Sequence, residues 1–196
     1  MLKTTKSEIS DGRRLRTERS RLTILNAAMT LQDAGNLVPT AQQISDQAGI
    51  SIRSFFRHFE DMESLFEAGD VHIRTSYEAL FLAGERGGTL EERVEHAVQH
   101  RVRAYEAISK LLLAVHAQLW RYKTLRKSYA RNQLGLRSVL DDWLPELKSL
   151  PREKREAVDA ITSFEMWNRL RVHQGLSKRM STGIVTNMLQ ALVSQG

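Results

Sequence analysis

The sequence predicts an all-α protein with an N-terminal helix-turn-helix domain followed by a larger helical domain. Its 196 residues contain only three prolines, and each lies between segments in which apolar residues recur at spacings of three and four. No segment shows the sustained alternation of apolar and polar residues that is typical of half-buried strands. We therefore expect about nine helices and no sheet.

Composition restricts the class of protein. A hydrophobic content of 41% is enough for a substantial core, and the absence of cysteine excludes disulfides, thiolate metal sites and cysteine nucleophiles. No apolar run approaches the roughly 20 residues that span a bilayer, so we expect a cytoplasmic protein with no membrane partner. The net charge of +6 favours a polyanionic partner such as nucleic acid.

The first segment, residues 1–16, is polar and rich in lysine and arginine, and we expect it to be a flexible basic arm. Its Arg13, Arg14 and Arg16 are candidates for contacts in a DNA minor groove. A purely solubilising tail is an equally good interpretation.

Residues 17–66 carry the pattern of a helix-turn-helix domain. A first helix is expected from about Thr17 to Ala34. Thr40 followed by Gln43 has the form of a capping box, which predicts that a second, short helix begins there. Gly49 and then Ser51 provide a glycine suited to a positive φ and an N-cap for a third helix, so two short helices joined by a tight turn result.

The third helix is amphipathic in a particular way. At about 100° per residue, Phe55 and Phe59 share one face, while Arg53, Ser54 and Arg57 lie on the opposite face. Outward arginines on such a helix can donate two hydrogen bonds to a guanine or grip phosphate, and only the former reads sequence. The alternative is an ordinary solvated face.

This segment resembles the N-terminal domain of tetracycline-repressor (TetR) type transcriptional regulators over about residues 20–70. The residues that carry the resemblance are Thr40, Ile44, Ala48-Gly49-Ile50-Ser51, Phe55-Phe56, His58-Phe59, Glu63 and Leu65. The resemblance implies DNA contacts from Thr40, Ser51, Arg53, Ser54, Phe56, Arg57 and His58.

Two positions depart from the family pattern. Phe56 and Arg57 stand where the family has a tyrosine before its HF pair, so a phenolic hydrogen bond to phosphate is replaced by a cation. Met62 stands where the family commonly has a phosphate-contacting lysine. Ile52, where a polar residue is frequent, either presses on a thymine methyl group or completes the core.

Residues 67–196 are expected to form the dimerisation and ligand-binding domain. The spacing predicts helices at about Met62–Gly84, Leu90–Tyr105, Ala107–Trp120, Thr124–Leu144, Arg152–Gln174 and Ser177–Ser194. The last two carry more apolar rows than one core usually needs, which agrees with the four-helix dimer interface that the resemblance implies. The interface candidates are Val158, Ile161, Phe164, Glu165, Ile184, Val185, Met188, Leu189 and Leu192. The alternative is that all of these residues belong to the core of a single chain.

Regulators of this type usually hold an effector among their middle helices, which makes large residues with polar atoms candidates for the pocket lining. These candidates are Tyr105, His116, Trp120, Tyr129, Trp143 and Trp167, although ordinary core positions explain each of them as well. His96 and His100 have the spacing of a metal-binding pair, but Ala97 stands where a metalloprotease would have glutamate. We expect no metal site, no cofactor and no catalytic residues.

The sequence thus predicts a homodimeric, sequence-specific DNA-binding transcriptional regulator, most simply a repressor released from its double-stranded operator by a small-molecule effector. The alternative is a helical protein-interaction module that has kept the fold and lost operator binding. Met62 and the missing tyrosine are the features that favour this alternative.

Overall fold

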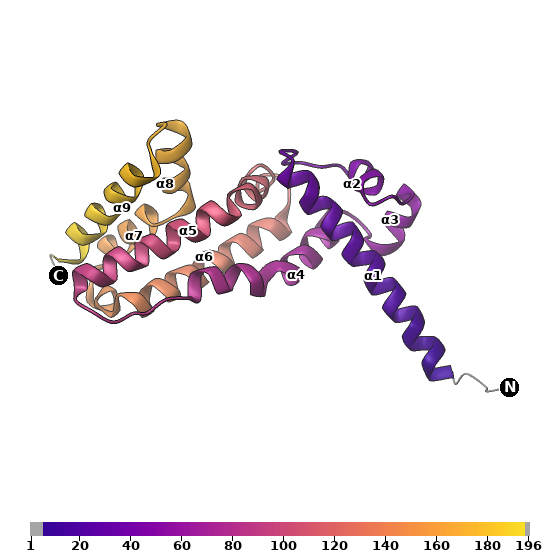
Figure 1. The fold of residues 1–196 in the computed structure, drawn as a ribbon, viewed down its shortest axis with the longest axis horizontal. Helices are drawn as coiled ribbons and strands as arrows, with labels where there is room; N and C mark the ends of the chain where they lie inside the picture. The colour runs from indigo at the N-terminus through magenta and orange to yellow at the C-terminus, as the bar shows by residue number, and fades with distance from the viewer. Residues whose placement is uncertain (1–5, 195–196) are drawn as a thin grey trace. The chain divides into compact units, whose positions relative to one another are not determined.

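The computed structural model describes residues 6–194, with side chains from Arg14 onward, and all regular elements within these residues are helices (Figure 1). The all-α prediction is confirmed. The elements are α1 (Lys6–Asp33), α2 (Ala41–Gln47), α3 (Ile52–His58), α4 (Met62–Leu82), α5 (Leu90–His116), α6 (Lys123–Trp143), the 3₁₀ turn η1 (Pro145–Ser149), α7 (Arg152–Ile161), α8 (Phe164–Asn168), the π-helical turn η2 (Arg169–His173) and α9 (Lys178–Val193).

The described chain forms two compact units. The first consists of the residues up to 72 together with residues 110–127, and the second of residues 73–109 together with those from 128 onward. Helices α4, α5 and α6 therefore each contribute residues to both units. No helix in the described residues combines the length and apolar character needed to cross a membrane.

Helix α1 begins at Lys6, much earlier than the expected Thr17. Residues 6–16 are thus helical where a flexible arm was expected, because arginine, lysine, leucine and glutamate are strong helix formers and a packed helix propagates into such a segment. Arg14 and Arg16 lie exposed on this helix, whereas the side chain of Arg13 lies outside the described residues.

The core of the first unit joins α1, α2 and α3, which pack against one another. Ile24 from α1, Ile44 from α2 and Phe55 from α3 are completely buried at its centre. Phe59 and Leu65 extend this core toward α4. The aromatic face predicted for the third helix is therefore the face that holds the two short helices on α1.

In the second unit, one expected helix break lies close to that in the structure and one expected helix is divided. The break expected at residues 105–107 corresponds to a kink within α5, where Ile108 has non-helical backbone angles (φ −112°, ψ 17°). The helix expected at 152–174 is interrupted after Ile161. Thr162 Oγ1 donates to Val158 O at 2.8 Å and Ser163 Oγ accepts from Met166 N at 3.2 Å, so hydroxyl-backbone hydrogen bonds compete with a continuous helix.

Candidate nucleic-acid interface

The start of α2 is fixed by a reciprocal pair of hydrogen bonds. Thr40 Oγ1 accepts from the backbone N–H of Gln43 at 3.2 Å, and Gln43 Oε1 accepts from the backbone N–H of Thr40 at 2.9 Å. This is the predicted capping box, which is confirmed. Thr40 is exposed, so its side chain is accessible at the helix N-terminus, where amide groups and the helix dipole favour a phosphate.

The turn between α2 and α3 depends on one glycine and one serine. Gly49 has φ +67°, and a Cβ built there would meet no atom within 4 Å, so the requirement for glycine comes from the backbone angle alone. Ser51 Oγ accepts from Ser54 N at 3.2 Å and donates to Ser54 Oγ at 3.1 Å. The Ser51 hydroxyl is thus used to cap α3 as predicted, although its side chain is exposed.

Helix α3 divides into a buried and an exposed side. Phe55 and Phe59 are buried with ring centroids 5.8 Å apart, and Ile52 packs against the same core. Arg53 and Arg57 are exposed, and their side chains form no hydrogen bond or ion pair with the described residues. The opposite face of a firmly anchored helix thus carries two unpaired guanidinium groups.

Phe56 adds an apolar element to this exposed side. Half of its surface is exposed, although its ring meets the buried Phe55 ring edge-on at a centroid distance of 5.3 Å. The exposed side of α3 thus presents a partly exposed aromatic ring together with two cations.

Arg21 of α1 is a residue whose role sequence reasoning missed. Its Nη1 donates to the backbone oxygen of His58 at 2.5 Å, and its guanidinium carbon lies 4.3 Å from the centroid of the Phe59 ring. It therefore ties the C-terminal end of α3 to α1, where a cation is favourable. The available signal was its position one turn before Leu25, on the face of α1 that is buried.

His58 is partly buried at the end of α3. Desolvation, followed by repulsion from Arg57 and Arg21, lowers the pKa of His58 from its ordinary value. The imidazole is therefore neutral at pH 7 in the free protein, and a neutral imidazole can still donate a hydrogen bond through its N–H.

The structure distributes the pocket candidates unevenly. Tyr105 and Trp167 line a pocket in the second unit, and Trp143 is buried with its ring 5.4 Å from that of His100. Tyr129 is partly buried and donates to Glu165 Oε1 at 2.5 Å.

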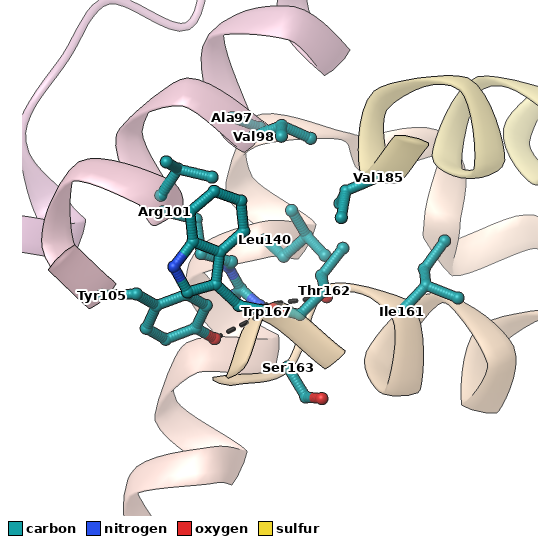
Figure 2. A pocket seen from close by; sticks show the side chains of 11 residues that line it. Ala97, Val98, Arg101, Tyr105, Leu140, Ile161, Thr162, Ser163, Trp167 and Val185 are labelled. Atoms are coloured by element: carbon teal, nitrogen blue, oxygen red, sulfur yellow. Dashed lines mark hydrogen bonds between the residues drawn. The ribbon is translucent and has the colours of Figure 1, made fainter. Parts of the chain in front are cut away.

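The other pocket candidates do not line this pocket (Figure 2), and two of them lie in the other unit. His116 and Trp120 belong to the first unit, and Trp120 is 79% exposed. The α5 helix ends at His116, and the turn that follows carries Trp120 to the surface. No group of three or more metal-binding side chains occurs in the part of the chain that the structure describes, so His96 and His100 stand without a third ligand there.

The interface candidates separate into buried and accessible sets. Five of them are buried in the core of the single chain, which agrees with the alternative interpretation for these positions: Val158, Ile161, Phe164, Val185 and Leu189. The reason is that α9 packs on α7 through the stripe that contains Val185 and Leu189. The accessible set consists of exposed Glu165 and Met188 and of half-buried Ile184 and Leu192.

Comparison with known proteins agrees with this geometry. The family model described as bacterial regulatory proteins of the tetR family matches residues 24–68, the segment that contains the core of α1, both short helices and the start of α4. The N-terminal domain of the chain therefore belongs to the TetR family. The chain is a DNA-binding transcriptional regulator, and its helix-turn-helix is the DNA-binding element.

Two solved structures share the fold of this chain. A proposed TetR-family transcriptional regulator from Rhodococcus sp. is 17% identical with a TM-score of 0.65, covering 89% of this chain and 99% of the other. A transcriptional regulator from Rhodococcus sp. Rha1 is 13% identical with a TM-score of 0.67, covering 91% of this chain and 96% of the other. No curated protein sequence matches the chain.

Proposed function

We propose that this TetR-family regulator is a homodimeric repressor that binds a two-fold symmetric operator and is released from it by a small-molecule effector. DNA binding is supported by Arg53 and Arg57, which are exposed and form no ion pair with the described residues. They lie on a helix whose other face is buried through Phe55 and Phe59. We propose Arg53, Ser54 and Arg57 as the groups that meet bases or phosphates in the major groove.

We further propose that Thr40, Ser51, Phe56 and His58 contact the sugar-phosphate backbone and fix the orientation of α3. Backbone contacts position a recognition helix without reading sequence. A regulator of this kind acts where bacterial DNA is, so the proposal places the protein in the cytoplasm. It includes no enzymatic activity, because the family match is to regulatory proteins.

The dimer is supported by the outer face of α9. Met180 and Met188 are exposed there, Met180 by 57%, and Ile184 between them is half-buried. These residues recur at a spacing of four, so they form a stripe that lies about 100° around the helix from the buried row of Val185 and Leu189. We propose a second copy of the chain as the occupant, with Glu165 and Leu192 at the edges, because a symmetric operator requires two heads.

Release by an effector is supported by the course of α5 and α6. Both helices contribute side chains to the pocket of the second unit and then continue into residues 110–127, which belong to the first unit. There Gln118 Nε2 donates to Leu37 O at 3.3 Å, and Thr124 Oγ1 donates to Glu63 Oε2 at 2.6 Å. Helix α5, across its kink at Ile108, and helix α6 therefore both run from the pocket residues into the chain segment of the DNA-binding unit.

The test is a mobility-shift measurement with DNA that flanks the protein's own gene. We expect retention by the wild type, and a loss of about 1–3 kcal/mol of specific affinity for each of Arg53→Ala and Arg57→Ala if both read bases. Arg103→Ala, which removes an exposed arginine of the second unit, is the matched control for charge. Unchanged binding by the Arg53 and Arg57 double variant would contradict the assignment, and failure of the wild type to bind any such DNA would favour the protein-interaction alternative.

A further inference from the structure

Helix α1 extends well beyond the core of the first unit. Its buried residues begin at Ile24, and the first side chain that is partly shielded from solvent is that of Ser20. Every described side chain before it, from Arg14 to Arg19, is exposed, and Figure 1 shows this end of α1 running past α3 with no other element of the described chain beside it. A helical segment that buries nothing gains no stability from tertiary packing. Its exposed surface therefore indicates what it can contact.

This segment is strongly cationic. Residues 14–21 contain four arginines and one glutamate. Arg14 and Arg19 form no hydrogen bond or ion pair through their side chains with the described residues. Leu15 is exposed by 58%, and no apolar stripe accompanies it on the described part of the segment. Guanidinium groups without an apolar stripe fit a polyanion rather than a partner helix or a membrane surface.

The contact of Arg21 with α3 determines which face of α1 lies on the side of the recognition helix. Arg21 Nη1 donates to His58 O at 2.5 Å, so the face that carries Arg21 is the face that meets the C-terminal end of α3. Arg14 precedes Arg21 by seven residues, which is about 20° less than two full turns. The two side chains therefore share a face and lie about 10 Å apart along the helix axis. Arg19 is about 160° away from Arg21, on the far side of α1.

The helical form restricts what Arg14 can contact on a duplex. An α-helix with its side chains is about 10–12 Å across, whereas the minor groove of B-DNA is about 6 Å wide. A helix thus cannot enter the minor groove as a flexible arm would. Phosphates follow one another at about 3.4 Å along each strand, so a cation about 10 Å beyond the end of α3 reaches about three phosphates further along the backbone.

We propose that the N-terminal segment of α1 is a second DNA-contacting surface, in which Arg14 binds a backbone phosphate beyond the C-terminal end of α3. This inference rests on the proposed function, because α3 must lie on DNA for Arg14 to reach that phosphate. The contact contributes to affinity and orientation and does not read sequence. It replaces the minor-groove contact that a flexible arm would make.

The test measures the affinity of the full-length protein for two duplexes of equal length as a function of salt. One is the DNA that flanks the protein's own gene, and the other has a random sequence. Arg14→Gln removes the charge and keeps a good helix former. We expect a loss of about fivefold at 0.1 M salt on both duplexes, and a decrease of about 0.9 in the slope of log affinity against log salt, because one phosphate contact is lost. Arg19→Gln on the far side of the same helix is the matched control and should leave the slope unchanged.

An insertion tests the role of the helix itself. One alanine inserted between Thr17 and Glu18 rotates Arg14 by about 100° relative to Arg21 and places Leu15 in its position, with no change in charge. The insertion should weaken DNA binding as much as Arg14→Gln does. A flexible arm would tolerate it, so unchanged affinity would overturn the helical contact.

The base composition of the duplex distinguishes phosphate from groove. The loss caused by Arg14→Gln should be the same in A·T-rich and G·C-rich random duplexes, because both have the same phosphates. A loss confined to A·T-rich DNA would place Arg14 in the minor groove and overturn the phosphate assignment.

The two proposals fail separately. A wild type that binds the DNA flanking its own gene no better than the random duplex contradicts the sequence-specific repressor, while a loss on the random duplex caused by Arg14→Gln still supports the α1 surface. Unchanged binding of both duplexes by Arg14→Gln, with weaker specific binding by Arg53→Ala, overturns the α1 surface alone. A wild type that binds neither duplex at low salt overturns both.

Discussion

Single residues in this protein show how much a hydrogen-bond partner matters once a polar group is buried. Ser45 of α2 and Ser181 of α9 are both completely buried. Ser45 Oγ donates to Ala41 O at 2.7 Å, whereas Ser181 Oγ has no partner among the described residues. The buried hydroxyl is therefore expected to stabilise the folded state at Ser45 and to destabilise it at Ser181.

We predict that Ser181→Ala stabilises the protein by up to about 1 kcal/mol, because it removes a buried hydroxyl that gains nothing from the fold. Ser45→Ala is the matched control and should lower the free energy of unfolding by about 0.5–1.5 kcal/mol. Urea unfolding of both variants measures the difference. A Ser181→Ala variant less stable than the Ser45→Ala variant would show that Ser181 has a partner in solution.

His58 predicts a pH dependence of DNA binding. Its pKa is lowered in the free protein, and a nearby phosphate would raise it, so binding takes up a proton over the interval between these two values. Affinity should therefore increase as the pH falls from about 8 toward 6, at constant salt. Folding has the opposite sign, because the unfolded chain, with its pKa near 6.5, binds the proton more readily and stability falls below that pH.

His58→Gln keeps a hydrogen-bond donor and removes the titration, so its DNA affinity should vary less with pH than that of the wild type. Mobility shifts across this range provide the comparison. A wild-type pH profile that matches the His58→Gln profile would mean that His58 does not face phosphate in the complex.

At the scale of elements, a carboxylate of α4 caps the N-terminus of a different helix, α6. Glu63 in the first turn of α4 accepts from the backbone N–H of Lys123 at 3.2 Å and from Thr124 Oγ1 at 2.6 Å. It thereby caps the N-terminus of α6 and favours the positive end of that helix dipole. The ring of Phe66, one turn further along α4, meets Tyr122 at a centroid distance of 4.9 Å.

We expect Glu63→Gln to retain part of this cap and Glu63→Ala to lose it, at a cost of about 0.5–2 kcal/mol in the free energy of unfolding. Glu67→Ala, on the same helix and exposed, is the control and should change stability by less than about 0.5 kcal/mol. Chemical denaturation followed by circular dichroism measures both. Equal effects of the two alanine variants would show that the Glu63 cap does not stabilise the protein.

The elements also show what could and could not be predicted from the sequence. The capping box at Thr40 and the turn at Gly49 were predictable because they depend on residues a few positions apart. The break at Thr162 was missed because its hydroxyl competes with a helix only in this packing, where it also accepts from Arg101. Periodicity gave the apolar rows of α9 but not which row faces the chain's own core.

Part of the candidate site could likewise be predicted from local sequence, and part could not. The outward pair Arg53 and Arg57 followed from the helical period and the aromatic face. The contact of Arg21 with His58 O, like the placement of Arg101 beside Thr162, joins residues far apart in sequence, and no local pattern encodes such contacts.

For the whole molecule, the proposed dimer predicts the effect of charge on the outer stripe of α9. Met180→Lys combined with Met188→Lys should yield monomers that remain folded, because both side chains are exposed in the single chain and would be desolvated only between copies. Leu134→Lys changes an apolar residue of α6 that is also exposed and is the control. Sedimentation velocity distinguishes the two variants, and a wild-type monomer at micromolar concentration would contradict the dimer directly.

The same dimer determines the shape of the operator. Two-fold symmetry presents one α3 helix from each subunit, and the two must lie about 34–36 Å apart to enter successive major grooves on one side of the DNA. Footprinting should therefore reveal a protected palindrome whose half-sites are one helical turn apart, with protection lost in the Arg53 and Arg57 double variant. The monomeric Met180 and Met188 variant should bind a half-site only weakly, since it loses the second contact surface while keeping the first.

An effector can release the DNA if it binds only the form of the dimer whose two α3 helices are not spaced for successive major grooves. It then weakens DNA binding by the ratio of its affinities for the two forms, and DNA must weaken effector binding by the same factor. A protected site without dyad symmetry would rule out this geometry even if the protein binds DNA.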